Sequence, residues 1–315
     1  MNVEQEGSPR IEIDAESDMR AVTFTANGEY IVGGSHDGLG VWRVEDGKQM
    51  ATMKVGPIRC LAVSQSGRWI AAGTNNCNVF VWDAETFEEV FSQKEDHLIL
   101  AVDFSPDSPR LLVGQNDYRT GPSVWDVPTR KKVLTLERGN RVVKYSPQGD
   151  RIATATFDSV RVCDSDDGHM LVQIPVKVTP PFNTGLLWLN NHLFVVSGST
   201  CKQLEASTGS TVSEWPIPSS GDYSCIAIAQ HGEFIAYSTN DTVTFWDTST
   251  HAQLGLIPQP QRINPIALSP HERLLAIGGA GGKITIRSLS RVTVSIAFLW
   301  IIANLNNFLV PLVFK

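Results

Sequence analysis

The sequence lacks the residue patterns of disulfide-stabilised secreted proteins and of strongly basic nucleic-acid binders. Its 315 residues include only five cysteines, an odd number without a Cys-x-x-Cys pair, and the formal net charge is -7 at pH 7. The cysteine usage argues against a disulfide framework and favours reduced thiols in the cytoplasm or nucleus. The negative charge argues against a uniformly basic surface, so we expect no specific nucleic-acid partner.

Signals for targeting and catalysis are also missing. Residues 1–10 are polar, without the basic start and apolar stretch of a signal peptide. No Ser-His-Asp arrangement or metal-ligand spacing is visible, and the glycine-rich residues 278–282 lie between two strand-like segments with no helix to hold a phosphate. His231 and His271 occupy equivalent turns, but a third ligand is missing, so we interpret them as surface residues. We therefore expect no catalytic activity, no cofactor and no metal.

What the sequence does contain is a repeated strand ending, in which a strand-like run leads to a marker residue and then usually to an acid. The markers recur at intervals of 38 to 43 residues. A period of about forty residues with several strands per copy is typical of a β-propeller with four-stranded blades. The markers are Trp42, Trp82, Trp125, Cys163, Leu204, Trp246 and Arg287, and the acids that follow are Asp83, Asp126, Asp164, Glu205 and Asp247.

Each copy has the same internal plan. A first strand of small and apolar residues is followed by a tight turn, a second strand, a polar turn, the marker strand and an outer strand. Small residues at the end of the second strand, such as Gly33, allow neighbouring blades to approach closely. Cys60 and Cys225 share the small position of the first strand with Ala21 and Ala101, which indicates packing rather than redox chemistry.

The repeats resemble those of WD40 proteins over residues 19–290, most clearly at Val81-Trp82-Asp83, Val124-Trp125-Asp126 and Phe245-Trp246-Asp247. The resemblance implies an all-β fold, a seven-bladed β-propeller of four-stranded antiparallel blades. It also implies a non-catalytic scaffold, a monomer or a subunit of a larger complex, that binds other proteins or peptide segments through top-face loops and the channel rim. A propeller enzyme is one alternative.

The chain departs from the WD40 pattern at a histidine that in this family joins the marker tryptophan and a turn aspartate in a buried hydrogen-bonded tetrad. Only Asp96-His97 keeps a histidine near that place, although turn acids remain at Asp37, Asp158 and Asp241. The resemblance therefore implies few such tetrads. We expect the stability of the blades to depend on packing instead.

Two groups of residues are candidates for partner binding. Arg20, Arg59 and Arg141 each precede the small position of a first strand, and equivalent positions of a propeller form a ring around its axis. Arginines there could bind the carboxylate or phosphate groups of an acidic partner. Alternatively, each could pair with a neighbouring acid or simply lie along its blade. Tyr118 and Arg119 belong to the longest irregular turn and are of residue types enriched at binding hot spots, although a neutral insertion also explains them.

The two ends of the chain fit one structural place. Residues 10–14 of the N-terminal segment 1–18 fit the fourth strand of the last blade, which WD40 propellers often complete by such an exchange. Residues 292–299 of the C-terminal tail 291–315 are β-rich and fit the same strand, and both cannot occupy it. We favour closure by the N-terminal segment, with the tail outside the ring or against its edge.

The tail has two further interpretations. Residues 292–314 carry no charge and are long enough to span a membrane, which would anchor the propeller on the cytosolic side, although residues 304–307 and Pro311 interrupt the apolar run. Alternatively, the change in composition after Arg291 indicates a tail that is not the evolved end of the domain.

Overall fold

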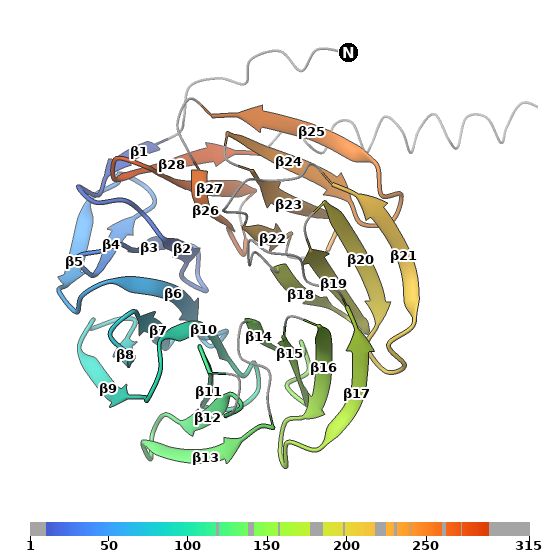
Figure 1. Cartoon of the computed structure of the whole chain (residues 1–315). Coiled ribbons are helices and arrows are strands. Elements are labelled where there is room, and N and C mark those ends of the chain that lie inside the picture. The colour runs from blue at the N-terminus through green and yellow to red at the C-terminus, as the bar shows by residue number, and fades with distance from the viewer. Residues whose placement is uncertain are drawn as a thin grey trace, which may run out of the picture.

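The chain forms a ring of seven four-stranded antiparallel sheets in the computed structural model, and the described residues contain no helix (Figure 1). The structure describes residues 11–117, 120–137, 142–156, 158–176, 185–197, 199–217, 225–229, 232–239, 241–259, 263–271 and 273–289. In each blade the first strand faces the central opening and the fourth lies at the periphery (Figure 1). The predicted fold, an all-β seven-bladed propeller, is confirmed.

The strands of the first six blades follow the chain from the innermost to the outermost position of each blade. Blades 1 and 2 contain β2 (Ala21–Phe24), β3 (Tyr30–Gly34), β4 (Leu39–Arg43), β5 (Gln49–Met53), β6 (Ile58–Val63), β7 (Trp69–Thr74), β8 (Asn78–Asp83) and β9 (Glu89–Lys94). Blades 3 and 4 contain β10 (Ile99–Phe104), β11 (Arg110–Gln115), β12 (Ser123–Asp126), β13 (Lys131–Thr135), β14 (Val142–Tyr145), β15 (Arg151–Ala155), β16 (Ser159–Asp164) and β17 (Met170–Pro175). Blades 5 and 6 contain β18 (Gly185–Leu189), β19 (His192–Ser197), β20 (Thr200–Glu205), β21 (Thr211–Pro216), β22 (Ile226–Ile228), β23 (Phe234–Ser238), β24 (Thr242–Asp247) and β25 (Gln253–Pro258).

Blade 7 is built from both ends of the described chain. It contains β26 (Ile263–Leu268), β27 (Leu274–Gly279) and β28 (Lys283–Ser288), and its fourth strand is β1 (Ile11–Asp14). This is the place that the sequence predicts for residues 10–14, of which Arg10 lies outside the described residues. Antiparallel pairing of β1 with β28 therefore closes the ring.

The marker residues occupy one structural position in all seven blades. Each lies opposite the second residue of the second strand of its blade, and in the first six blades a β-bulge sits at the marker where its strand pairs with the outer strand. The sequence alignment of the seven repeats, including those without a tryptophan, therefore agrees with the strand register of the structure residue by residue. The pairs are Trp42–Ile31, Trp82–Ile70, Trp125–Leu111, Cys163–Ile152, Leu204–Leu193, Trp246–Ile235 and Arg287–Leu275.

The acid after the marker stabilises the turn that leads to the outer strand. The carboxylate of Asp83 accepts hydrogen bonds from the backbone N–H groups of Glu85 and Thr86, at 3.0 and 2.9 Å. Asp126 accepts from the backbone and the hydroxyl of Thr129 in the same way. The hydrogen bonds from Thr86 lower the pKa of the Asp83 carboxyl group, and those from Thr129 lower the pKa of the Asp126 carboxyl group. The acids thus act as structural caps.

Glycines at the ends of second strands let adjacent blades approach. A Cβ atom added to Gly34 would lie 2.9 Å from Cβ of Ile58, and one added to Gly73 would lie 2.7 Å from both Cβ of Ile99 and Sγ of Cys60. Distances below 3 Å leave no room for a methyl group, so only glycine fits where β3 faces the start of β6 and β7 faces the start of β10.

The cysteines are packing residues. All five are free thiols, and burial raises the pKa of both Cys60 and Cys201 to about 12. A thiol with such a pKa is protonated and unreactive at neutral pH, which agrees with the interpretation of Cys60 as a small packing residue.

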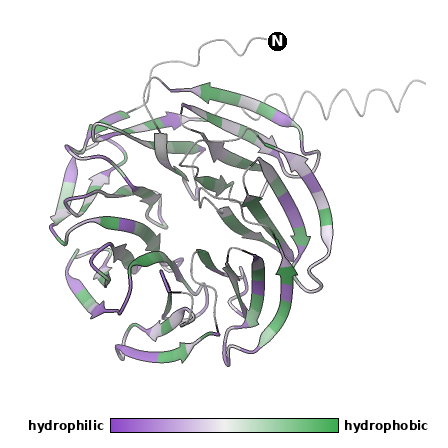
Figure 2. Ribbon diagram, in the orientation of Figure 1, coloured by the Kyte–Doolittle hydropathy of each residue, from purple (hydrophilic) through white to green (hydrophobic). Residues whose placement is uncertain are grey.

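The polar and apolar residues are distributed as expected for stacked blades. Figure 2 shows apolar colour over much of the inner strands, interrupted by polar segments, and mixed colour along the outer strands β5, β9, β13 and β17. No helix within the described ranges is long and apolar enough to cross a membrane, and residues 292–314 lie outside those ranges.

Candidate functional site

The two described arginines of the predicted ring, Arg20 and Arg59, flank a single dipeptide at the end of β3. The backbone N–H of Arg20 donates to the carbonyl of Gly34 over 2.8 Å. The backbone N–H of Ile58, the neighbour of Arg59, donates to the carbonyl of Ser35 over 2.8 Å. The structure thus brings the two residues to the start of adjacent innermost strands, at the end of the ring that we call the top face.

The side chains of Arg20 and Arg59 are both exposed and form no ion pair within the described part of the chain. Arg59 is the extra residue of a β-bulge, since the pairing of β6 with β7 shifts between Ile58 and Cys60. A bulge redirects a side chain out of the regular alternation of a strand. The described residues thus show neither arginine paired with a neighbouring acid.

The turn after β7 adds amide groups beside Arg59. The backbone N–H of Asn75 donates to the carbonyl of Pro57 over 2.9 Å, which holds the turn against the loop before β6. The side-chain oxygen Oδ1 of Asn75 is buried and has no hydrogen-bond partner in the described residues. Exposed Asn76 follows it. The rim of blades 1 and 2 therefore combines two cationic donors with amide groups, a set suited to carboxylates and peptide groups.

The remaining candidates, Arg141, Tyr118 and Arg119, lie outside the described residues. Of the described residues next to them in the chain, Oδ2 of Asp117 accepts hydrogen bonds from the backbone N–H and the hydroxyl of Thr120, at 3.1 and 2.7 Å. Asp117 also lies 3.5 Å from Nε2 of His97. Asp117 thus links the described residue Thr120 to the loop that enters blade 3.

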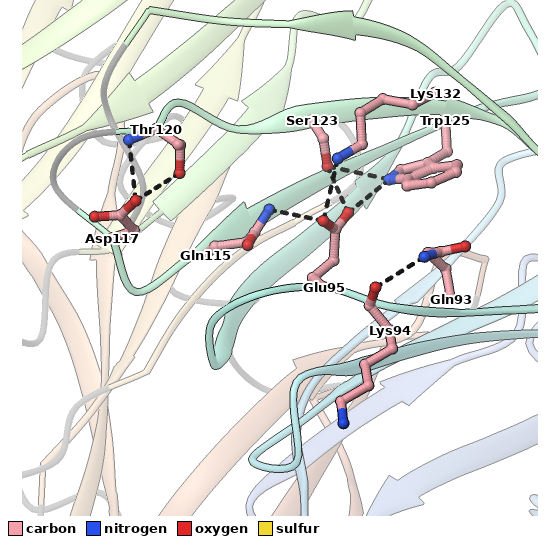
Figure 3. Close-up of polar contacts among 9 residues, drawn as sticks. All are labelled: Gln93, Lys94, Glu95, Gln115, Asp117, Thr120, Ser123, Trp125 and Lys132. Carbon is pink, nitrogen blue, oxygen red and sulfur yellow. Dashed lines mark hydrogen bonds and ion pairs between the residues drawn. The ribbon is translucent and has the colours of Figure 1, made fainter.

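A buried carboxylate that the sequence did not reveal, that of Glu95, lies in blade 3 among four polar side chains (Figure 3). Oε1 of Glu95 accepts hydrogen bonds from Nε1 of Trp125 at 2.8 Å and from the hydroxyl of Ser123 at 2.9 Å. Its Oε2 accepts from Nε2 of Gln115 at 3.1 Å and from Nζ of Lys132 at 3.2 Å. Lys132 also lies over the Trp125 ring, 5.0 Å from its centroid. All four groups around Glu95 are donors, and one of them carries the compensating charge.

We expected packing, rather than hydrogen bonding, to stabilise the blades. In blade 3 this expectation is wrong, because the marker Trp125 is hydrogen-bonded to Glu95 as well as packed. The family pattern directs attention to His97, but His97 is partly exposed and faces Asp117, while Glu95 lies two residues earlier and contacts Trp125. In the sequence, Ser123 is the residue that points to such a network. Its hydroxyl lies two residues before a buried tryptophan, and a buried hydroxyl needs a hydrogen-bond partner nearby.

The other marker tryptophans follow the expectation of packing more closely. Trp82 stacks on Phe80 with ring centroids 5.5 Å apart, and the ring of Trp42 covers Gly40 so closely that a Cβ there would clash. Among the described residues, Nε1 of Trp246 donates to the hydroxyl of Thr244, over 3.3 Å. In these blades, the residue two places before the marker thus makes the packing contact or the hydrogen bond that fixes the tryptophan ring.

The turn acids Asp37, Asp158 and Asp241 remain in local turns. Oδ1 of Asp158 accepts from the hydroxyls of Thr156 at 2.6 Å and Ser159 at 3.1 Å, and these side-chain hydrogen bonds lower its pKa. The backbone N–H of Asp37 donates to Oγ of Ser35 at 3.2 Å, and Oδ1 of Asp241 accepts from the Thr239 hydroxyl at 3.3 Å.

The glycine-rich residues 278–282 have a structural role. They include the turn between β27 and β28, where a Cβ on Gly282 would lie 2.6 Å from the backbone nitrogen of Ser17. The backbone N–H of Gly281 donates to Oδ1 of Asp18 at 2.5 Å. The glycines therefore make room for the segment between β1 and β2.

The histidines give no indication of a metal site. His271 is exposed and His231 lies outside the described residues. Within the described ranges, no three histidine, cysteine or acidic side chains are grouped as metal ligands.

Comparisons with known proteins agree with the fold. Residues 47–83 match the sequence model of the WD40 family, described as "WD domain, G-beta repeat". Among solved structures, the β-propeller domain of Cps50 (Swd1) from Myceliophteria thermophila is similar, with 16% sequence identity and a TM-score of 0.78 over 90% of this chain and 99% of that chain. Curated protein sequences gave no match. At 16% identity the likeness shows the fold, and the matched repeat confirms the resemblance to WD40 proteins.

Proposed function

We propose that this chain, a seven-bladed propeller with WD40 repeats, is a non-catalytic protein–protein interaction scaffold that binds an acidic peptide segment at the top-face rim of blades 1 and 2. WD40 propellers generally serve as interaction scaffolds, which supports the general class. The observation that carries the specific proposal is that Arg20 and Arg59 are exposed on both sides of Gly34-Ser35 without an ion pair among the described residues.

The proposed mechanism is docking on a preformed surface. The backbone hydrogen bonds of Arg20 and of Ile58 to β3 and its end fix the positions from which the two guanidinium groups extend, so little backbone ordering is needed on binding. Each guanidinium can donate two parallel hydrogen bonds to one carboxylate. Exposed Asn76, in the turn after β7, supplies a side-chain amide group for the peptide backbone of the same partner.

An affinity pull-down with mass spectrometry tests the proposal, comparing the wild type with Arg20→Ala/Arg59→Ala. Each charge-assisted hydrogen bond contributes about 1.5 to 3 kcal/mol, so we expect the partner's affinity to fall at least tenfold. Arg68→Ala is a matched control, because Arg68 is exposed in the turn at the opposite end of β7. Unchanged capture by the double variant, or equal loss with Arg68→Ala, would exclude this rim as the binding site.

We propose in addition that the scaffold works in the cytoplasm or nucleus. The five free thiols, two of them with pKa values raised to about 12 by burial, fit a reducing compartment. Cell fractionation of the full chain tests this localisation. Recovery of the protein in the membrane fraction, reversed by removing residues 292–314, would favour the membrane-tethered adaptor instead.

A further inference from the structure

The turns between the third and fourth strands carry opposite charges in blades 2 and 3. The sixth and seventh residues after the marker are Glu88 and Glu89 in blade 2, and Lys131 and Lys132 in blade 3. Among the first six blades, only these two neighbours have a like-charged pair at this place, once with each sign. The corresponding pairs in blades 1, 4, 5 and 6 are Lys48-Gln49, His169-Met170, Ser210-Thr211 and Ala252-Gln253.

The charged side chains of these two turns are exposed. Five of them form no ion pair with any residue that the structure describes. Lys132 is the exception, because its Nζ lies 3.2 Å from Oε2 of the buried Glu95. Both turns therefore keep a net charge that an oppositely charged surface would neutralise. We call Glu85, Glu88 and Glu89 the acidic edge, and Arg130 and Lys131 the basic edge.

The two edges lie beside each other at the periphery of the ring. The outer strands that follow them, β9 and β13, belong to neighbouring blades (Figure 1). Because the two turns occupy the same place in the repeat, the edges lie at the same height along the ring axis. This height is at the end opposite the top face, since the third strand of each blade begins at the top face and ends at the marker turn. Arg20 and Arg59 are therefore not part of this surface.

An apolar side chain stands beside each edge. Val90 is the extra residue of the bulge in β9, where the pairing with β8 shifts. Val133 holds the same place in β13 and is 49% exposed. A bulge bends an outer edge and hinders the addition of a further strand. A partner at this surface would therefore be held by side-chain contacts, with charges beside an apolar centre.

The charge pattern makes this surface complementary to itself. A two-fold axis that runs parallel to the ring axis, between blades 2 and 3, places the acidic edge of each copy opposite the basic edge of the other. A two-fold axis at right angles to the ring axis places each edge opposite its own copy, so that like charges meet. We propose that the chain forms a symmetric dimer through this surface, with an acidic–basic contact on each side of the two-fold axis.

A second copy fits this surface better than an unrelated partner, because the match requires no further coincidence. The separation between the two edges is by necessity identical in both copies, and both edges lie at one height. An unrelated partner would need a basic and an acidic group at the same separation. Charge complementarity determines the orientation and the rate of such an association more than its strength, so we expect a dimer that weakens with added salt.

The dimer leaves both proposed binding rims accessible. An axis parallel to the ring axis points the two top faces in the same direction, and the contact lies at the opposite end of the blades. A partner with two acidic segments would then reach Arg20 and Arg59 of both copies, which raises its apparent affinity without new contacts. Dimerisation itself does not depend on the proposed function, and Arg20→Ala/Arg59→Ala should dimerise as wild type does.

Charge reversal followed by sedimentation velocity tests the dimer in the full-length chain. Glu88→Lys/Glu89→Lys gives a variant with two basic edges, and Arg130→Glu/Lys131→Glu gives a variant with two acidic edges. We expect each variant alone to self-associate at least about tenfold more weakly than wild type at low salt, because like charges meet twice in the symmetric contact. Mixing the two variants should restore the association, since every basic edge then meets an acidic one.

Two further variants separate the effect of the edges from that of charge in general. The variant with all four substitutions keeps the net charge of wild type and exchanges the two edges, so it should dimerise again. Glu45→Lys/Glu233→Lys changes the net charge as much as the blade 2 reversal does, at exposed positions in turns of blades 1 and 6, and should leave the association unchanged. A wild type that stays monomeric, a reversed variant that dimerises as wild type does, or a mixture that associates no better than its two components would each refute the dimer.

Discussion

The carboxylate of Glu95 accepts a hydrogen bond from the indole nitrogen of Trp125 over 2.8 Å, and so connects the loop that enters blade 3 to the third strand of that blade. A carboxylate at this place carries a full charge into a buried site, which only paired and hydrogen-bonded charges tolerate. Lys132 supplies the countercharge from the outer strand of the blade. The network therefore spans the blade from its entry loop to its edge.

Removing the Glu95 carboxylate should destabilise the ring. Glu95→Ala leaves the indole of Trp125, the hydroxyl of Ser123 and the amide of Gln115 without their acceptor, and we expect a loss of about 2 to 4 kcal/mol in the free energy of unfolding. Urea denaturation followed by tryptophan fluorescence measures this loss. Asp96→Ala changes the exposed neighbour of Glu95 and should shift the midpoint little; equal losses would mean that the network contributes nothing specific.

The capping acids should make the stability depend on pH in the acid range. The pKa of Asp83 is lower in the folded chain than its usual value, chiefly through the backbone N–H of Thr86. The stabilisation is therefore complete above the unfolded pKa, about 3.9, and is lost as the pH falls through the folded value. Denaturation at a series of pH values should show Asp83→Asn destabilised at pH 7 and the difference from wild type shrinking below about pH 4.

The Asp83→Asn variant has a matched control at Glu85, which lies in the same turn. Glu85→Gln removes one charge at an exposed position where only the backbone N–H contacts Asp83. A gap between Asp83→Asn and wild type that stays constant down to pH 2 would contradict a capping role for the carboxylate.

Adding a methyl group at Gly73, where blades 2 and 3 meet, should destabilise the fold. Gly73→Ala places Cβ against Ile99 and Cys60, and overpacking of this kind costs about 1 to 3 kcal/mol. Adding Ile99→Ala should recover part of that loss relative to the sum of the two single changes. Gly255→Ala is the control, because nothing lies within 4 Å of the added atom. Thermal unfolding of the four variants measures the coupling, and strict additivity would exclude a direct clash.

The rim arginines should act through geometry as well as charge. Arg20→Lys/Arg59→Lys keeps both positive charges but removes the planar fork that holds a carboxylate with two hydrogen bonds. We expect its affinity for the captured partner to lie between those of wild type and of the double alanine variant, and to weaken more steeply with salt than that of the alanine variant. If the double lysine variant bound the partner as tightly as wild type, the two arginines would contribute only their charge, and not the planar geometry of the guanidinium group.

The sequence predicts the fold well because strand periodicity and turn residues repeat in every blade. Even Cys163, Leu204 and Arg287 occupy the marker position that the repeat predicts, since their registers follow from neighbouring strands rather than from their own side chains. The network around Glu95 could not be found in the same way, because it depends on which side chains meet between a loop and a strand. For the rim, Arg20 and Arg59 are placed together, whereas Arg141, Tyr118 and Arg119 remain predictions.

The pairing of Ile11 with Ile286 has a consequence for how the protein is made. The strand β1 precedes β28 by more than 260 residues in the chain, so β1 leaves the ribosome long before β28 exists. At about 5 to 20 residues per second, its apolar edge waits on the order of ten seconds or more without its partner. Until then the six blades that precede β26 lack the blade that closes the ring, and unpaired strand edges of this kind favour aggregation.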